Sequence, residues 1–149
     1  MIEHPHAVEI LLLEDEPADA YLVKMALKEG KIMANLHHVI DGSEGLDFLQ
    51  KVGKYANAPR PDLIFLDLNM PRMNGCEFLE AMKANALLND IPVVVLTTSD
   101  VENDVVRSYQ LGAASYITKP VDMSQFISAI HQLNEYWFTL VRLPQGHKI

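Results

Sequence analysis

The sequence contains a single cysteine, Cys76, so no disulfide bond can form within one chain. Basic residues are also scarce, because 12 Lys and Arg stand against 20 Asp and Glu and leave a net charge of −8. Such an acidic chain repels the phosphate backbone of nucleic acids, and we therefore expect no direct nucleic-acid binding. The lone cysteine fits a reducing compartment.

Long apolar stretches are missing as well. The longest runs, Ile10–Leu13 and Val93–Leu96, are far too short to cross a bilayer. No cationic lead region precedes the first of them, and Glu3 and Glu9 interrupt it, so the pattern differs from that of a signal peptide. We therefore expect a soluble, cytoplasmic protein that makes no membrane contact.

The sequence does contain a regular alternation of strand and helix patterns. Apolar runs predict five strands, at Val8–Leu13, Asn35–Val39, Asp62–Leu66, Pro92–Leu96 and Ala114–Thr118. Two runs are apolar throughout, which is typical of strands covered on both faces. Helix-start signals follow, such as Pro17 and the pair Asn74 and Glu77. The pattern predicts one α/β domain, residues 1–149, with a doubly wound five-stranded parallel sheet and helices on both faces.

Polar residues follow four of the predicted strands at the point where each strand ends. Glu14 and Asp15 follow the first, Asp67 the third, Thr97 the fourth and Lys119 the fifth. The carboxyl ends of parallel strands share one edge of the sheet, and ligands bind there. Crowded carboxylates need a cation, and hard oxygen ligands favour Mg²⁺. We predict that Asp67 is a nucleophile for phosphoryl transfer, with a metal ion and Lys119 neutralising the transferred group.

Four segments carry a resemblance to a known family. The segments Leu11–Asp15, Phe65–Gly75, Val95–Ser99 and Tyr116–Pro120 resemble, in this order, the receiver domain of two-component response regulators. Each would be weak alone, but four in the right order at strand ends make a specific match. The resemblance covers about Glu9 to Ile130 and implies a flavodoxin-like receiver fold. It also implies a phosphoacceptor switch rather than an enzyme, which accepts a phosphoryl group from a sensor histidine kinase and signals through its protein-contact surface.

The resemblance further implies a role for each site residue. Asp67 would be the phosphoacceptor, in a reaction that requires Mg²⁺ or Mn²⁺. The metal ligands would be Asp15, Asp67, Glu14 through a water molecule, and the backbone carbonyl of Asn69. Lys119 would pair with the phosphoryl oxygens. The hydroxyl of Thr97 would turn to hydrogen-bond the phosphoryl group and Tyr116 would then move inward, so that these two residues form the switch.

The last predicted helix is longer than the sheet requires. It runs from Asp122 through about Arg142, which is roughly 20 residues or ~30 Å, whereas a typical strand spans only ~17–20 Å. We expect a core of about residues 8–130, with residues 131–149 forming an extension and tail. The apolar residues of this helix have the spacing of paired helices and predict a homodimer interface, made of Phe126, Ile130, Leu133, Trp137 and Leu140. The alternative is that the tail folds back on its own domain.

The tail also bears on the kinase partner. It contains Tyr136-Trp137-Phe138 and then Leu143-Pro144, and it resembles the tail of stand-alone response regulators paired with bacterial phytochromes. That narrower resemblance implies a phosphohistidine of a light-regulated kinase as the donor. No stretch remains after this helix for a DNA-binding output domain, so we expect output through a protein contact.

Two other classes of protein stay open at this point. An aspartate-nucleophile phosphatase of the haloacid dehalogenase type also uses Mg²⁺, but it needs a second aspartate where this sequence has Asn69. A non-phosphorylated α/β module could bind a flavin or nucleotide at the same edge. The sequence has neither a P-loop nor a Gly-x-Gly-x-x-Gly pattern, which argues against that module.

Overall fold

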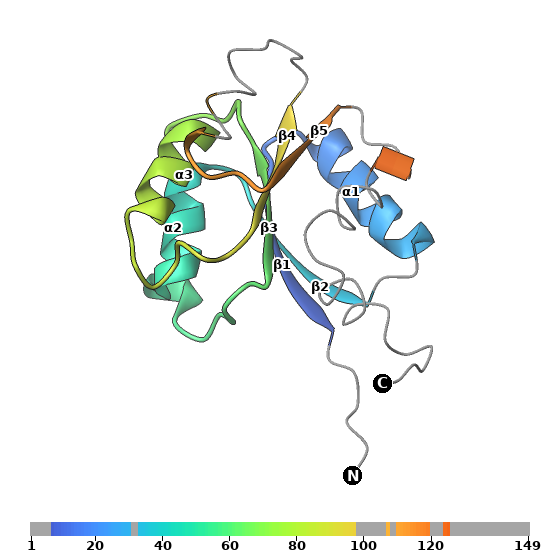
Figure 1. Ribbon diagram of the computed structural model, residues 1–149. Helices are drawn as coiled ribbons and strands as arrows, with labels where there is room; N and C mark the ends of the chain where they lie inside the picture. The colour runs from blue at the N-terminus through green and yellow to red at the C-terminus, as the bar shows by residue number, and fades with distance from the viewer. Residues whose placement is uncertain (1–6, 31–32, 98–106, 108–109, 120–123, 126–149) are drawn as a thin grey trace, which may run out of the picture.

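The computed structural model describes residues 7–30, 33–97, 107, 110–119 and 124–125 of the chain. The elements within these ranges are β1 (Val8–Leu13), α1 (Pro17–Glu29), β2 (Ala34–Val39), α2 (Gly42–Gln50), a 3₁₀ helix (Gly53–Tyr55), β3 (Leu63–Asp67), α3 (Gly75–Lys83), β4 (Val93–Thr97) and β5 (Ser115–Thr118). The strands form one parallel sheet in the order β2-β1-β3-β4-β5. Figure 1 shows α2 and α3 on one face and α1 on the other. The predicted doubly wound α/β fold is confirmed.

The observed strand bounds agree with the predicted ones to within one residue. The structure shifts β3 and β4 by one residue toward the C-terminus, so that they begin at Leu63 and Val93 and end at Asp67 and Thr97. Asp67 lies opposite Leu96 of β4, and Thr97 lies opposite Thr118 of β5. The ladder therefore continues through both polar residues, and the last position of each strand is fixed by backbone pairing rather than by an apolar side chain.

The central strands fill an apolar layer on each face of the sheet. Successive side chains of a strand point to opposite faces. Leu12 and Phe65 therefore join the layer that packs against α1, whereas Leu11 and Ile64 join the layer that packs against α2 and α3. All four side chains are completely buried. This two-sided burial explains why the strand runs are apolar at every position, and it makes the sheet a rigid support for the residues at its edge.

Polar side chains fix the starts of α2 and α3. Asn74 and Glu77 form the predicted capping box, in which each side chain accepts a hydrogen bond of 2.9 Å from the backbone N–H of the other residue. Asp41 caps α2 by accepting from the N–H of Glu44 at 2.8 Å. The Glu44 carboxylate accepts from the N–H of Ile40 at 3.1 Å, one residue before the cap. Both helices therefore begin at the edge where the strands end.

Gly75 allows α3 to begin directly against the end of β3. A Cβ at this position would lie 2.5 Å from the carbonyl oxygen of Asp67 and 2.7 Å from the Cα of Leu68. The N–H of Gly75 also donates to the carbonyl oxygen of Leu68 at 3.0 Å. The helix start thus contacts the backbone that carries Asp67, and this close approach depends on the missing side chain.

Several predictions concern residues that lie outside the described ranges. The proposed interface residues all belong to this group: Phe126, Ile130, Leu133, Trp137 and Leu140. Of the predicted last helix, only Ser124 and Gln125 are described, and both are helical. Within the described ranges, no helix combines the length and apolar character that crossing a membrane requires.

Candidate functional site

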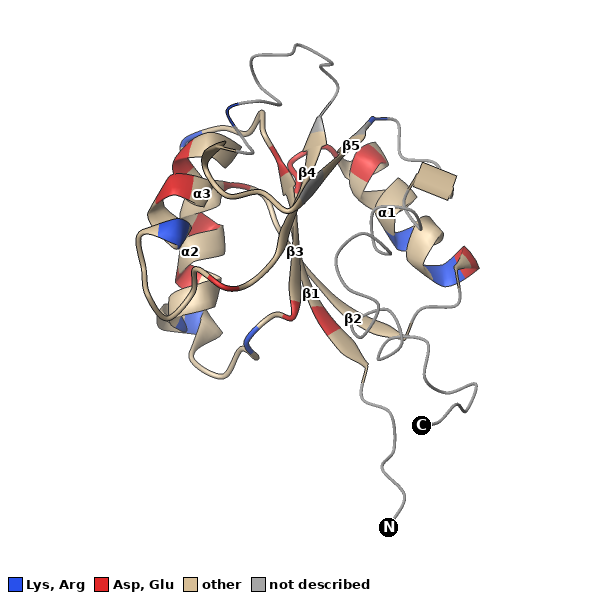
Figure 2. Ribbon diagram, in the orientation of Figure 1, with Lys and Arg blue, Asp and Glu red and all other residues tan. Residues whose placement is uncertain are grey.

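Four charged side chains from the ends of three strands meet at the carboxyl edge of the sheet. Glu14 and Asp15 follow β1, Asp67 ends β3 and Lys119 follows β5. Each of the three acids offers an oxygen atom, and these atoms all lie within 4.8 Å of one another. Figure 2 shows acidic segments gathered at this end of the sheet, near the tips of β4 and β5. The structure therefore brings together the acidic residues and the lysine that the sequence predicted to meet.

The three acids differ in their access to water. Glu14 is 0% exposed and Asp67 is 3% exposed, whereas Asp15 lies at the surface. A buried carboxylate loses its hydration and requires compensation by a cation or by hydrogen bonds. Glu14 and Asp67 are two such groups side by side, and together they require nearby positive charge.

Lys119 supplies part of that positive charge. Its ammonium nitrogen lies 2.6 Å from Oε1 of Glu14, 3.0 Å from Oδ2 of Asp19 and 3.3 Å from Oδ1 of Asp67. The Lys119 side chain is only 4% exposed. Burial alone would lower the pKa of Lys119, but its interactions with Glu14, Asp19 and Asp67 outweigh burial and raise that pKa above its usual value. The lysine is therefore charged at every physiological pH.

Asp19 is the contact that sequence reasoning missed. It lies in the first turn of α1 and is not one of the three acids that fit a metal ion. Its carboxylate accepts a hydrogen bond from Lys119 at 3.0 Å. The sequence feature that could have indicated this contact is the position of Asp19, in the first turn of a helix that starts at the same edge of the sheet. The sequence gives no indication that this side chain turns toward β5 rather than toward solvent.

One ammonium group does not satisfy the buried acids. Burial and the negative charge of Glu14 raise the pKa of Asp67 to about 7, although Lys119 and the N–H of Asn69 act against this rise. Among the described residues, Oε1 of Glu14 finds no hydrogen bond of acceptable geometry, despite its short ion pair with Lys119. An under-compensated cluster of carboxylate oxygens suits a hard divalent cation such as Mg²⁺ or Mn²⁺. The residues present therefore fit the metal ion that the sequence predicted.

The remaining predicted site residues are placed by the backbone. Asn69 lies two residues after Asp67, and its N–H donates to Oδ1 of that residue at 3.3 Å. Thr97 ends β4, the strand beside β3. Tyr116 lies on β5 and is 39% exposed, which is an outward position. The parts assigned to Thr97 and Tyr116 in switching stay predictions.

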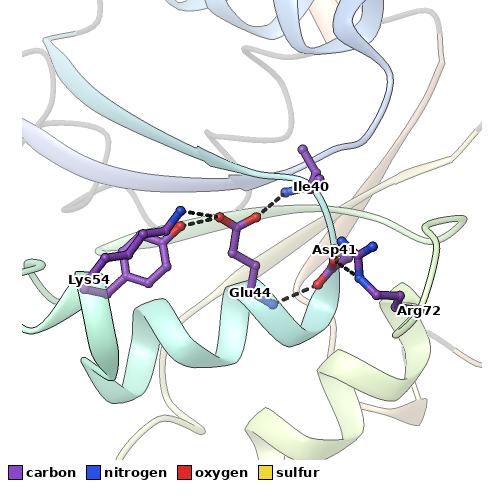
Figure 3. Close-up of polar contacts among 6 residues, drawn as sticks. Ile40, Asp41, Glu44, Lys54 and Arg72 are labelled. Atoms are coloured by element: carbon purple, nitrogen blue, oxygen red, sulfur yellow. Dashed lines mark hydrogen bonds and ion pairs between the residues drawn. The ribbon is translucent and has the colours of Figure 1, made fainter.

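The loop between β3 and α3 is tied to α2 by an ion pair that the sequence did not reveal. Arg72 has a φ of 61°, in the left-handed region that disfavours residues with a side chain. Its Nε donates to Oδ2 of the buried Asp41 at 2.7 Å, and its Nη2 bonds the same oxygen. Figure 3 shows Arg72 reaching from this loop to the start of α2. The N–H of Gly42 also donates to the carbonyl oxygen of Met73 at 3.0 Å.

The same end of α2 carries a second polar cluster around Glu44. Its carboxylate accepts from the hydroxyl of Tyr55 and lies 3.5 Å from the ammonium group of Lys54 (Figure 3). Burial acts to raise the pKa of Glu44, but the hydrogen bonds from Tyr55 and Ile40 lower it below its usual value. Burial and the hydrogen bond to Glu44 raise the pKa of Tyr55 to about 12. The cluster fixes the 3₁₀ helix against α2 and stands apart from the metal-fitting acids.

Comparison with known proteins identifies the family. The sequence matches the response regulator receiver domain over residues 10–131. The chain belongs to this family. It is 44% identical over 135 residues to response regulator Rcp1 of Synechocystis sp., and the match covers 91% of this chain and 92% of Rcp1.

Solved structures of two relatives have the same fold as this receiver domain. The phosphorylated cyanobacterial phytochrome response regulator RcpA is 41% identical, with a TM-score of 0.77 and coverage of 90% of this chain and 96% of RcpA. The Mn²⁺-bound form of Rcp1 is 40% identical, with a TM-score of 0.72 and coverage of 93% and 92%. The predicted family and its narrower resemblance to phytochrome response regulators are thereby confirmed.

The ion pair between Arg72 and Asp41 should stabilise this receiver domain. We expect Arg72→Ala to lower the free energy of unfolding by about 1–2 kcal/mol, because the buried Asp41 carboxylate loses its cation. The loss should not be larger, because the Arg72 side chain is exposed and solvent screens its charge. Arg72→Gly should be less damaging than Arg72→Ala by about 1 kcal/mol, since glycine adopts the left-handed backbone without strain. Urea unfolding measures both. Lys54→Ala is the control, and equal losses in Arg72→Ala and Arg72→Gly would contradict the backbone argument.

The raised pKa of Asp67 predicts a pH-dependent cost in stability without metal. The unfolded carboxyl has a pKa near 3.8 and the folded one about 7, so the folded state is progressively destabilised as the pH rises through this window. Asp67→Asn removes that cost. We expect the variant to exceed the wild type in unfolding free energy at pH 8 by on the order of 1 kcal/mol or more, and by less at pH 4. Unfolding in chelator measures this, and a difference independent of pH would refute it.

Proposed function

We propose that this receiver domain accepts a phosphoryl group on Asp67 from a phosphohistidine of a sensor histidine kinase. The observation that carries the proposal is the meeting of Glu14, Asp15 and Asp67 within 4.8 Å, with Lys119 3.3 Å from Asp67. Phosphoryl transfer to an aspartate requires acidic oxygens that hold a metal ion, a nucleophilic carboxylate and an ammonium group.

The divalent ion would be held by carboxylate oxygens of Asp15 and Asp67, by Glu14 through a water molecule, and by the backbone carbonyl of Asn69. When bound, Mg²⁺ or Mn²⁺ supplies charge neutralisation for the phosphoryl oxygens. The structure of Rcp1 with Mn²⁺ supports this choice of ion. The unsatisfied Glu14 oxygen and the raised pKa of Asp67 support the need for it.

The residues of the chain would act on the phosphoryl group as follows. The ionised carboxylate of Asp67 attacks phosphorus, so that an O–P bond forms while the P–N bond to the donor histidine breaks. Lys119 pairs with the phosphoryl oxygens and reduces the charge that develops on them. The hydroxyl of Thr97 donates to the phosphoryl group, and Tyr116 then moves inward from its exposed position on β5. The altered surface beside β5 is the signal, read by a protein partner.

The same relatives support a proposal for the kinase partner. RcpA is a cyanobacterial phytochrome response regulator, which supports a phytochrome-type histidine kinase as the donor for this chain. We propose output through protein contact in the cytoplasm, without direct nucleic-acid binding, in keeping with the net charge of −8. An aspartate-nucleophile phosphatase remains the weaker candidate, because Asn69 replaces the second aspartate that it requires.

Incubation with acetyl phosphate and Mg²⁺ tests the proposal. Intact mass measurement should find one added phosphoryl group, stable in acid and labile in base. Asp67→Asn should abolish the addition and a chelator should suppress it. The matched control is Asp62→Asn, which changes a carboxylate just before the start of β3. Modification of Asp67→Asn to the wild-type extent, or catalytic turnover of small phosphate esters by the wild type, would reject the proposal.

We further propose that the chain forms a homodimer through its last helix. The support is the spacing of apolar residues in the sequence, Phe126, Ile130, Leu133, Trp137 and Leu140. Light scattering at high micromolar concentration, with and without acetyl phosphate, should detect a dimer. Leu133→Glu should shift it to monomer, whereas Glu29→Gln on α1 should not. A monomer under both conditions would reject the homodimer.

A further inference from the structure

Lys119 makes its best-formed hydrogen bond to a residue outside the metal-fitting cluster. The contact with Oδ2 of Asp19 is 3.0 Å long and has hydrogen-bond geometry, whereas Asp67 lies farther away, at 3.3 Å. Glu14 lies nearest, at 2.6 Å, but within the described part of the chain its Oε1 has no hydrogen bond of acceptable geometry. An ammonium group has three N–H donors, so each acid near Lys119 competes for one of them.

Asp19 differs from the other two acids in its relation to the metal ion. Glu14 and Asp67 belong to the cluster that fits a cation, and Asp19 does not. A bound divalent ion would therefore weaken the hold of Glu14 on Lys119 by neutralising that carboxylate, and would leave the hold of Asp19 in place. Of the three carboxylates around Lys119, Asp19 is thus the one that keeps its full attraction when the site is ready for phosphoryl transfer.

The position of Asp19 determines how its bond to Lys119 affects phosphoryl transfer. Asp19 extends from the first turn of α1, whereas Asp67 ends β3 within the sheet. The bond to Asp19 takes up one of the N–H groups of Lys119, and its negative charge reduces the attraction between Lys119 and phosphoryl oxygens. Both effects oppose transfer to Asp67. The side chain of Asp19 is 23% exposed, so solvent screens its charge and the effect should be moderate.

We propose that Asp19 is a positioning residue that restrains the ammonium group of Lys119 and thereby slows phosphoryl transfer to Asp67. This inference rests on the proposed function of Asp67 as phosphoacceptor. Asp19 acts through Lys119 and touches neither the phosphoryl group nor the metal ion. Its removal should therefore accelerate the reaction, which is a result that a merely structural defect does not produce.

The test compares rates of phosphorylation by acetyl phosphate at saturating Mg²⁺, followed by intact mass. We expect Asp19→Asn to raise the rate about threefold to tenfold, as the loss of one partly screened charge near Lys119 implies. Asp19→Glu should return the rate toward the wild-type value. Glu29→Gln is the matched control, because it removes an exposed acid at the far end of the same helix, and its rate should equal that of the wild type.

A second arm tests whether the effect passes through Lys119. In a Lys119→Gln background, the added Asp19→Asn change should alter the slow residual rate by less than about twofold, since the group that Asp19 restrains is gone. Beryllium fluoride, which forms a tetrahedral adduct on carboxylates, provides a binding readout without phosphoryl transfer. Calorimetry should find it bound more tightly by Asp19→Asn than by the wild type.

The outcomes separate this inference from the function on which it rests. A wild type that takes no phosphoryl group rejects the proposed function itself. A wild type that is modified on Asp67, together with an unchanged or slower Asp19→Asn variant, overturns only the restraint by Asp19. Equal acceleration by Asp19→Asn in the presence and absence of Lys119 overturns it as well, because the carboxylate would then act directly on the site.

Discussion

The site depends on one electrostatic constraint: in the described part of the chain, two buried carboxylates share one buried ammonium group. Glu14 and Asp67 are almost fully withdrawn from water, and Lys119 is the cation that contacts both. Such an arrangement is unfavourable for each acid alone and is held in place because the strands that carry these residues are themselves rigidly buried. The strain appears as the raised pKa of Asp67. The need for a further cation is therefore a property of the fold and not of any one residue.

The parallel sheet explains why this constraint can exist in so small a chain. Residues 14, 67 and 119 are far apart in sequence, but parallel pairing brings the ends of β1 and β3 side by side. The end of β5 lies at the same edge, two strands away from β3. Glycine at position 75 allows α3 to start against the backbone of Asp67, and the ion pair of Arg72 with Asp41 holds the intervening loop to α2. Backbone contacts thus orient the carboxylate, and side-chain charge sets its reactivity.

Much of this arrangement could be predicted from the sequence, for a definite physical reason. Strand periodicity locates the ends of strands, and the shared edge of a parallel sheet then places Glu14, Asp15, Asp67 and Lys119 together without knowledge of any contact. The contacts of Asp19 and Arg72 escaped prediction because they depend on side-chain direction and on a left-handed backbone at a residue other than glycine. Neither property has a local sequence pattern, since both are imposed by elements that are distant in the chain.

The crowding of acids around Lys119 also bears on how such a site can act as a switch. The ammonium group of Lys119 is shared among three carboxylates, at 2.6, 3.0 and 3.3 Å, and a change in local charge therefore alters how strongly each of them attracts it. A divalent ion or a phosphoryl group changes that charge by more than any side chain nearby. Because Asp19 belongs to α1 whereas Lys119 follows β5, a shift in the partners of Lys119 changes the force between two elements on either side of the site. The proposed phosphoryl transfer to Asp67 would in this way change the interaction between α1 and the residue that follows β5.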